Sequence, residues 1–316
     1  MALLTSARES PATQGGRAAH ALRVLLSARE DQLDSVLALR RVAAHLGDLR
    51  RTDPSELQPP PVAALVCDDM VVTERLLGLG VPVVHLGSGH PGPPAAEAPP
   101  GRAVGRLHRP GWLPPSGPLP RGTRPTGVLA PQRTGRSRTR SGTLLLLSLW
   151  GVPEADAEAF ATGALRGWAE AALHRTGNCT VVTDTGLDLL RSALGSLAEH
   201  PDVRVHRAVE ADVDALHADS AVFLASPVLG ALTLAQARRA PLVLLPPLGA
   251  AQRDLADRLA EVLPLPSAED PADPGVWALP ADAAAGPWHL LDPALDDLRG
   301  AQRVARTLRQ LALAPM

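Results

Sequence analysis

The residues best suited to chemistry lie between two apolar segments, 221–225 and 241–245, which have the length and composition of buried strands. Ser226 follows the first segment and opens a turn of small residues, and Gly230 and Thr233 then lie in the first turns of a predicted helix. The first backbone N–H groups of a helix have no partner within it, and the helix dipole adds partial positive charge. The pattern therefore predicts an anion site of the kind that binds the phosphates of a nucleotide.

The elements around this segment alternate between strand and helix. Residues 22–27 are predicted as a strand and 31–45 as a helix, and the alternation recurs over 62–86 and 143–262. Such alternation indicates parallel sheets, in which ligands bind outside the carboxyl ends of the strands. A helix start that binds nothing is the alternative interpretation of the turn after Ser226.

The same segment resembles the C-terminal half of GT-B glycosyltransferases, a group that includes the lipid-linked N-acetylglucosaminyltransferase of cell-wall synthesis. In that group a Gly-x-x-Thr-x-x-Glu run is followed by Leu-Pro-Pro and a Gln. The matching residues here are Gly230, Thr233, Gln236, Leu245, Pro246, Pro247 and Gln252. The overall layout also resembles the cytosylglucuronic acid synthases and related proteins of actinobacteria, which join glucuronate from UDP-glucuronate to cytosine. The resemblance implies an α/β fold of two Rossmann-like domains with parallel sheets, facing each other across a cleft.

The resemblance also implies roles for individual residues in binding a UDP-sugar donor. The donor phosphates are expected to be bound by residues at two turns between a strand and a helix: Ser148, Gly151, Ser226, Gly230, Ala231 and Thr233. Arg207, Ala208 and Gln236 are expected to bind the ribose and base, and Gly249 and Gln252 are expected to bind the donor sugar. No cofactor and no metal ion are expected, since the helix-end N–H groups would take the role of a divalent cation.

Four features of this region depart from the family pattern or have a simpler interpretation. Trp150 stands where the family has the first Gly of a phosphate turn, and Gln236 replaces a Glu that holds the ribose hydroxyls with charge assistance. Gln252 is alternatively an exposed residue in the first turn of the next helix. The segment 203–207, expected to present its backbone to the base, is alternatively an ordinary parallel strand.

Asp31 is the candidate general base, because it follows the first predicted strand in the loop that carries a His or an acid in the family. Glu30 beside it is a second candidate. Asp31 is alternatively the cap of the helix that follows. Asp68, Asp69 and His90 are the candidates on the acceptor side, with Asp68 and Asp69 alternatively a helix cap and a first-turn acid, and His90 a solvated loop residue.

The composition describes a globular protein of ordinary polarity. Of the 316 residues, 45% are hydrophobic and 20% charged, and the net charge of -2 gives no support to nucleic acid as a partner. Cys67 and Cys179 lie in apolar segments, and no disulfide is expected between them. The first twenty residues have no apolar core of a secretory signal, and no run is long enough to span a membrane, so a cytoplasmic location is expected.

Changes in composition suggest the domain limits. Residues 1–20 are expected to be disordered, 21–131 to form an acceptor-side domain, 132–141 a linker and 142–292 a donor-binding domain. Residues 293–316 are expected to form a helix that returns to the first domain. Between Glu97 and Glu154 the chain has no acidic residue but many arginines, which is typical of a solvated linker and also produces a local positive field.

Two classes of function follow. The first is a glycosyltransferase that uses a UDP-sugar, for which UDP-glucuronate is suggested, and a small-molecule acceptor such as cytosine or another precursor of secondary metabolism. The second is a non-catalytic GT-B-like accessory protein with a degenerate donor site, suggested by the missing Gly, Glu and His of the family. Small molecules are the expected partners, and a homodimer or a partner transferase is compatible with either class.

Overall fold

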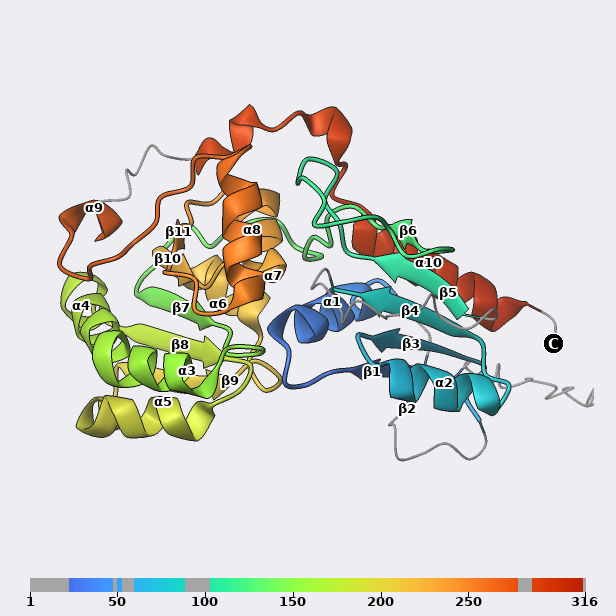
Figure 1. Cartoon of the computed structure of the whole chain (residues 1–316), viewed down its shortest axis with the longest axis horizontal. Helices are drawn as coiled ribbons and strands as arrows, with labels where there is room; N and C mark the ends of the chain where they lie inside the picture. Colours follow the sequence, from blue (N-terminus) through green and yellow to red (C-terminus); the bar gives the residue numbers. More distant parts are fainter. Residues whose placement is uncertain (1–22, 48–49, 53–59, 89–102, 278–285, 315–316) are drawn as a thin grey trace, which may run out of the picture.

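The fold consists of two parallel β-sheets, each with its own helices (Figure 1). The computed structural model describes residues 23–47, 50–52, 60–88, 103–277 and 286–314. The N-terminal sheet has the strand order β2-β1-β3-β4-β5-β6, and the C-terminal sheet has the order β11-β10-β7-β8-β9. Both orders place early strands in the centre and cross over to either side, as in doubly wound folds. The prediction of two Rossmann-like domains with parallel sheets is confirmed.

The N-terminal domain contains eight elements among the described residues up to 125. These are β1 (Arg23–Ala28), α1 (Leu33–Ala43), β2 (Arg50–Thr52), β3 (Ala63–Cys67), α2 (Met70–Gly78), β4 (Val83–Gly87), β5 (Ala103–Leu107) and β6 (Arg124–Pro125). The central strand β3 is buried along its whole length, as expected for a strand covered by helices on both faces. The predicted disordered segment 1–20 and His90 lie outside the described residues.

The C-terminal domain begins at β7, whose five residues are all buried. Its strands are β7 (Thr143–Leu147), β8 (Cys179–Thr183), β9 (Val203–Arg207), β10 (Val222–Ala225) and β11 (Val243–Leu244). Its helices are α3 (Glu154–Phe160), α4 (Arg166–Thr176), α5 (Leu187–Leu194), α6 (Val213–Asp219), α7 (Leu229–Ala237), α8 (Ala250–Ala260) and α9 (Pro274–Trp277). A π-helical turn, Ala161–Leu165, joins α3 to α4, and a 3-10 turn, Gly195–Glu199, follows α5.

The last helix, α10 (Gly300–Leu313), packs on the N-terminal domain. Val304 and Leu308 belong to the same buried cluster as Val24 and Leu65, on strands β1 and β3. The prediction that this helix starts at Pro293 is wrong, because 293–295 form a separate 3-10 turn. Two features delay the start of α10. The carboxylate of Asp296 accepts the Val128 N–H at 2.9 Å, and Leu298 adopts a left-handed backbone with φ of 60°.

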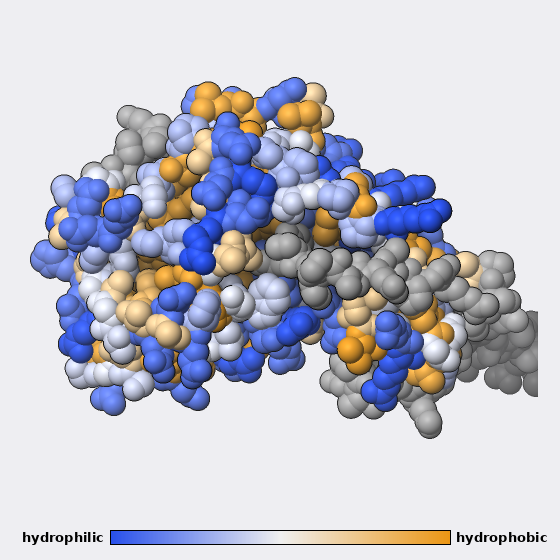
Figure 2. Space-filling model, in the orientation of Figure 1, coloured by the Kyte–Doolittle hydropathy of each residue, from blue (hydrophilic) through white to orange (hydrophobic). Residues whose placement is uncertain are grey.

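The visible surface is mostly hydrophilic, with apolar side chains only in small groups (Figure 2). Large exposed hydrophobic residues on the described part of the chain are few and scattered: Val71, Leu79, Leu290, Leu295 and Leu313. Within the described ranges, every helix is too short or too polar to cross a lipid bilayer.

Candidate functional site

Helix α1 of the N-terminal domain lies against the start of α7 in the C-terminal domain (Figure 1). Asp34 in the first turn of α1 accepts two hydrogen bonds there, from the Gly230 N–H at 2.6 Å and from the Leu229 N–H at 3.2 Å. The Asp34 side chain is buried, with 2% of its residue surface exposed. The backbone groups predicted to bind an anion thus hold one in this structure, and it is the protein's own carboxylate.

A second carboxylate, from the C-terminal domain, binds the start of α1 in the N-terminal domain. Asp184 directly follows β8 and accepts the Leu33 N–H at 3.2 Å, the Ser148 hydroxyl at 2.6 Å and the Leu149 N–H at 2.9 Å. Burial raises the pKa of Asp184, and its hydrogen bonds oppose that shift. Each domain therefore supplies an acid to the N-terminus of a helix in the other domain.

The close packing of the two helices depends on Gly230. A Cβ atom at this position would lie 2.5 Å from Cδ1 of Leu37 and 2.7 Å from Oδ1 of Asp34. Both distances are shorter than the contacts that real Cβ atoms make, so a side chain here would displace the side chains of Leu37 and Asp34. In the family motif this glycine lets a phosphate come close to the backbone. In this structure it lets α1 come close instead.

Arg41 connects α1 to both α6 and α7 from a buried position. Its guanidinium forms an ion pair with Asp214 at 2.8 Å and donates to the Thr233 hydroxyl at 3.1 Å. It also donates to the backbone carbonyls of Gly230 and Leu129, at 3.2 and 3.1 Å. The Arg41 side chain is 1% exposed. A fully bonded buried charge of this kind fixes α1 against the C-terminal domain.

The other predicted phosphate residues mostly make hydrogen bonds inside the C-terminal domain. The Thr233 hydroxyl donates to the Leu229 carbonyl at 2.8 Å, and the Ser226 hydroxyl accepts the Ser148 N–H at 3.1 Å. Ala231 is fully buried. Gly151 lies apart in an exposed turn with φ of 68°. The structure therefore gathers five of the six residues near the start of α7, and their role in phosphate binding stays a prediction.

The predicted ribose and base residues lie near two further contacts between the domains, which Trp112 and Arg40 of the N-terminal domain make. Gln236 accepts the indole N–H of Trp112 at 3.0 Å, and Trp112 packs in the core of the C-terminal domain. Ala208 is fully buried and donates its N–H to the Thr183 carbonyl at 2.7 Å. Arg207 ends the edge strand β9, which pairs with β8 alone. Arg40 of α1 donates to the carbonyls of Val209 and Ala211 in the loop that follows.

Gln252 is a buried residue in the first turn of α8, so the alternative interpretation of an exposed Gln252 is wrong. Its amide donates to the Ser148 carbonyl at 2.8 Å and accepts the Leu248 N–H at 3.0 Å. These two bonds hold the loop before α8 against the turn after β7. Gly249 lies in the same contact, since a Cβ there would come within 3.3 Å of the Gly151 carbonyl oxygen.

The predicted catalytic and acceptor residues have ordinary roles among the described contacts. Asp31 forms an ion pair with Arg29 at 2.7 Å and is half exposed. The hydrogen bond from Arg29 lowers the pKa of Asp31, which weakens it as a base. Asp31 is not the helix cap that the alternative proposed, because the cap position is Gln32. Asp69 caps α2 through the Val72 N–H, so the alternative of a helix cap is confirmed for this residue. The first-turn acid of that alternative is wrong, because Asp68 lies before the helix and accepts the Ser88 N–H at 2.8 Å.

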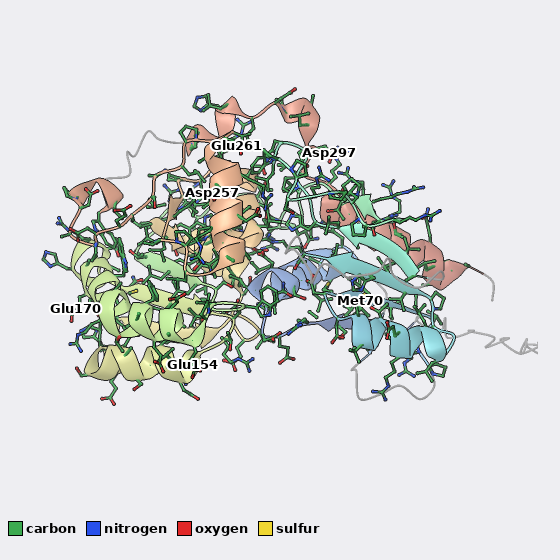
Figure 3. All side chains as sticks on the ribbon, in the orientation of Figure 1. Met70, Glu154, Glu170, Asp257, Glu261 and Asp297 are labelled. Carbon is green, nitrogen blue, oxygen red and sulfur yellow. The ribbon has the colours of Figure 1, made fainter. Side chains whose placement is uncertain are left out.

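Sequence reasoning missed Asp34, Asp184, Arg41 and Trp112. Only Asp184 carried a usable signal, because it directly follows a predicted strand, at the sheet edge where ligands bind. Many other acidic residues do not have this position directly after a strand. Glu154, Glu170, Asp257 and Glu261 are exposed and lie on the outer helices α3, α4 and α8 or just after α8 (Figure 3).

A family model described as CGA synthase-related protein matches residues 24–316. The chain belongs to the CGA synthase-related family. This match confirms the resemblance of the overall layout to the cytosylglucuronic acid synthases and related proteins. No curated protein sequence matches the chain.

Solved glycosyltransferase structures align with most of this chain at low identity. The spinosyn rhamnosyltransferase SpnG with thymidine diphosphate is 14% identical, with 92% of this chain and 96% of that chain covered and a TM-score of 0.44. LpCGTa with UDP is 13% identical, with coverage of 93% and 99% and a TM-score of 0.45. MurG of Acinetobacter baumannii is 12% identical, with coverage of 91% and 99% and a TM-score of 0.43.

Proposed function

We propose that this protein transfers a sugar from a UDP-linked donor to a small-molecule acceptor. UDP-glucuronate is the proposed donor, and cytosine or another small precursor the proposed acceptor. In this reaction the bond between the anomeric carbon and the phosphate oxygen breaks, and UDP leaves with the electron pair. The acceptor atom forms the new bond to the anomeric carbon and gives its proton to a base. Membership of the CGA synthase-related family supports this class of reaction.

One observation carries the proposal: the N–H groups of Leu229 and Gly230 hold a carboxylate where the family motif assigns the donor phosphate. A site that binds one anion through free helix-end N–H groups has the chemistry to bind another. A phosphate oxygen would replace each Asp34 oxygen on the same donors. Gln236 and the carbonyls of Val209 and Ala211 would then turn from Trp112 and Arg40 to the nucleoside.

Donor binding on this scheme requires α1 to move away from α7. Asp34, Leu37 and Arg41 all contact the first turns of α7, so a nucleotide diphosphate and α1 cannot occupy this place together. The described contacts thus correspond to a closed state in which Asp34 takes the place of the donor. Binding energy from the nucleotide would offset the loss of these contacts, which lowers its apparent affinity.

The test is donor binding by the full chain, measured as a shift in thermal unfolding with UDP, UDP-glucuronate and UDP-glucose. A ligand at about a hundred times its Kd adds roughly 2.7 kcal/mol to the stability of the folded state. Gln236→Ala should weaken the shift, whereas Gln302→Ala, on the exposed face of α10, serves as a matched control. Release of UDP from the preferred donor with cytosine present then tests the transfer itself.

A non-catalytic GT-B-like protein is the second candidate, and the same contacts favour it. Asp34 and Trp112 already satisfy the groups that the donor would bind, and the indole of Trp112 is buried in the C-terminal core. An absence of stabilisation by all of the uridine nucleotides would assign the protein to this class. A protein that binds UDP but never releases it from a UDP-sugar would also belong to this class.

A further inference from the structure

A cavity of ≈ 850 Å³ lies between the two domains at the linker. Its walls are the second half of α1, the linker residues 131–137, helix α6 and the residue after α7. Five of its lining residues are arginines: Arg40, Arg41, Arg133, Arg136 and Arg238. This volume falls in the range of small-molecule sites, so the cavity is large enough for an organic ligand and not only for an ion.

Three of the four acidic residues of the cavity have partners other than Arg136 and Arg238. Asp214 pairs with Arg41, Asp212 caps α6 through the Ala215 N–H, and Asp219 accepts the Ser137 hydroxyl. Glu210, the fourth acid of the wall, is exposed to solvent. Among the described residues, no carboxylate of the wall forms an ion pair with Arg136 or Arg238, although Asp214, Asp212 and Asp219 favour the charged form of Arg238 through space.

Arg136 and Arg238 bond to backbone carbonyls instead of to acids. Arg136 donates to the Ser220 carbonyl at 2.6 Å, and Arg238 donates to the carbonyls of Asp214 and Arg133 at 2.6 and 3.2 Å. The Nε atom of each guanidinium is buried and has no hydrogen-bond partner within the described part of the chain. Two buried cationic donors without acceptors are costly, and an anion would remove that cost.

The electrostatics of Arg136 agree with this geometry. Burial, followed by the neighbouring charges of Arg140 and Arg238, lowers its pKa to about 10. For Arg238, burial also lowers the pKa, with opposing effects from nearby acids. An anion beside both groups would reverse these shifts, because an opposite charge favours the protonated form.

We propose that this cavity is a second binding site, in which Arg136 and Arg238 hold the phosphate or carboxylate group of a small molecule. The site is separate from the start of α7, because Gly230 and Arg238 lie at opposite ends of that helix, about 12 Å apart along its axis. Guanidinium groups suit both oxyanions, since they present paired N–H donors in one plane. The walls come from both domains, so a bound anion would favour one relative domain position over others.

The test is calorimetric titration of the full chain with inorganic phosphate, pyrophosphate and glucuronate at constant ionic strength. At least one anion should bind, and Arg136→Gln should weaken its Kd by about tenfold or more, which corresponds to about 1.4 kcal/mol. Arg138→Gln is the matched control, since Arg138 has the same charge on the same linker but is exposed and does not line the cavity. Arg238→Gln supplies an independent second variant if Arg136→Gln does not fold.

The choice of titrants shows which class of anion binds, and a further variant distinguishes this cavity from the start of α7. Binding of phosphates alone assigns a phosphate ligand, and binding of glucuronate assigns a carboxylate. Gln236→Ala should leave this Kd unchanged, because the Gln236 side chain bonds to Trp112 and does not line the cavity. No binding by any anion, or equal weakening by Arg136→Gln and Arg138→Gln, would overturn the proposal.

Discussion

Asp34 and Gly230 are 196 residues apart in the chain, yet the Asp34 carboxylate accepts the Gly230 N–H at 2.6 Å in the centre of the domain interface. The bond combines a buried charge with the positive end of a helix dipole. It holds the two domains together at the place where the family motif puts a donor phosphate.

Removing this carboxylate should destabilise the protein. Asp34→Ala leaves the N–H groups of Leu229 and Gly230 buried without an acceptor, at a cost of about 3 kcal/mol in the free energy of unfolding. Urea unfolding measures the change. Asp297→Ala is the control, because it removes an exposed carboxylate paired with Arg303 and should cost less than about 1 kcal/mol. Equal losses for the two variants would show that Asp34 contributes no more than a surface acid.

A methyl group at position 230 should also separate the helices. Gly230→Ala places a Cβ against Leu37 and Asp34 and should cost about 1–3 kcal/mol through overpacking. Gly78→Ala is the matched control, since a Cβ at this residue of α2 meets nothing within 4 Å. That control should be neutral or slightly stabilising, because alanine restricts the unfolded chain more than glycine. A Gly230→Ala protein as stable as Gly78→Ala would argue against tight packing of α1 on α7.

Arg41 should be among the most sensitive positions in the interface. Arg41→Ala leaves Asp214 without its partner and should cost about 3–5 kcal/mol, the usual effect of breaking a buried ion pair. Arg166→Ala, which removes an exposed pair with Glu170, should cost about 0.5 kcal/mol or less. The two midpoints of chemical unfolding provide the comparison. A small effect of Arg41→Ala would mean that α1 is loosely attached.

Acid should destabilise the fold through His217. Burial, followed by the charges of Arg238, Arg136 and Arg41, lowers the pKa of His217 well below 6.5. The Nδ1 atom accepts a hydrogen bond from Arg238 at 2.9 Å, which requires the neutral ring. The unfolded chain takes up a proton near pH 6.5 and the folded chain does not. The free energy of unfolding should therefore fall as the pH drops below about 6.5, by up to about 1.4 kcal/mol per pH unit.

The His217→Gln variant isolates this contribution, because a Gln side chain can still accept the hydrogen bond from Arg238 but does not titrate. Urea unfolding between about pH 7.5 and pH 5.5 should have a shallower pH dependence in this variant than in the wild type. His174→Gln changes an exposed histidine and should keep the wild-type slope. Identical slopes for all three proteins would assign the acid sensitivity to other groups.

Local patterns in the sequence were sufficient to predict most elements of the sheets. Apolar runs predicted the strands around 65, 145 and 224, and the small residues after Ser226 predicted the start of α7 close to its observed place. These features depend on residues that are close in the chain, and the spacing of hydrophobic residues in the sequence reflects them. The final helix was misplaced because Asp296 and Leu298 interrupt it through backbone conformation and a contact with Val128.

The contents of the site could not be predicted in the same way. The loop after the first strand predicts Asp31 as the site residue, whereas the acid in the interface is Asp34, one turn further along. Whether a polar residue in a helix faces solvent or another domain depends on how the domains dock, and no local pattern in a single sequence records that. For the same reason Gln252 resembled a surface residue but is buried.

The central claim is that the start of α7 is the donor phosphate site and that Asp34 competes for it. Calorimetric titration of UDP into wild type and Asp34→Asn tests this most directly, because the variant keeps the shape of the side chain and removes its charge. We predict that Asp34→Asn binds UDP at least about tenfold more tightly, a gain of about 1.4 kcal/mol. Equal affinity in the two proteins, or no UDP binding by either, would contradict the claim.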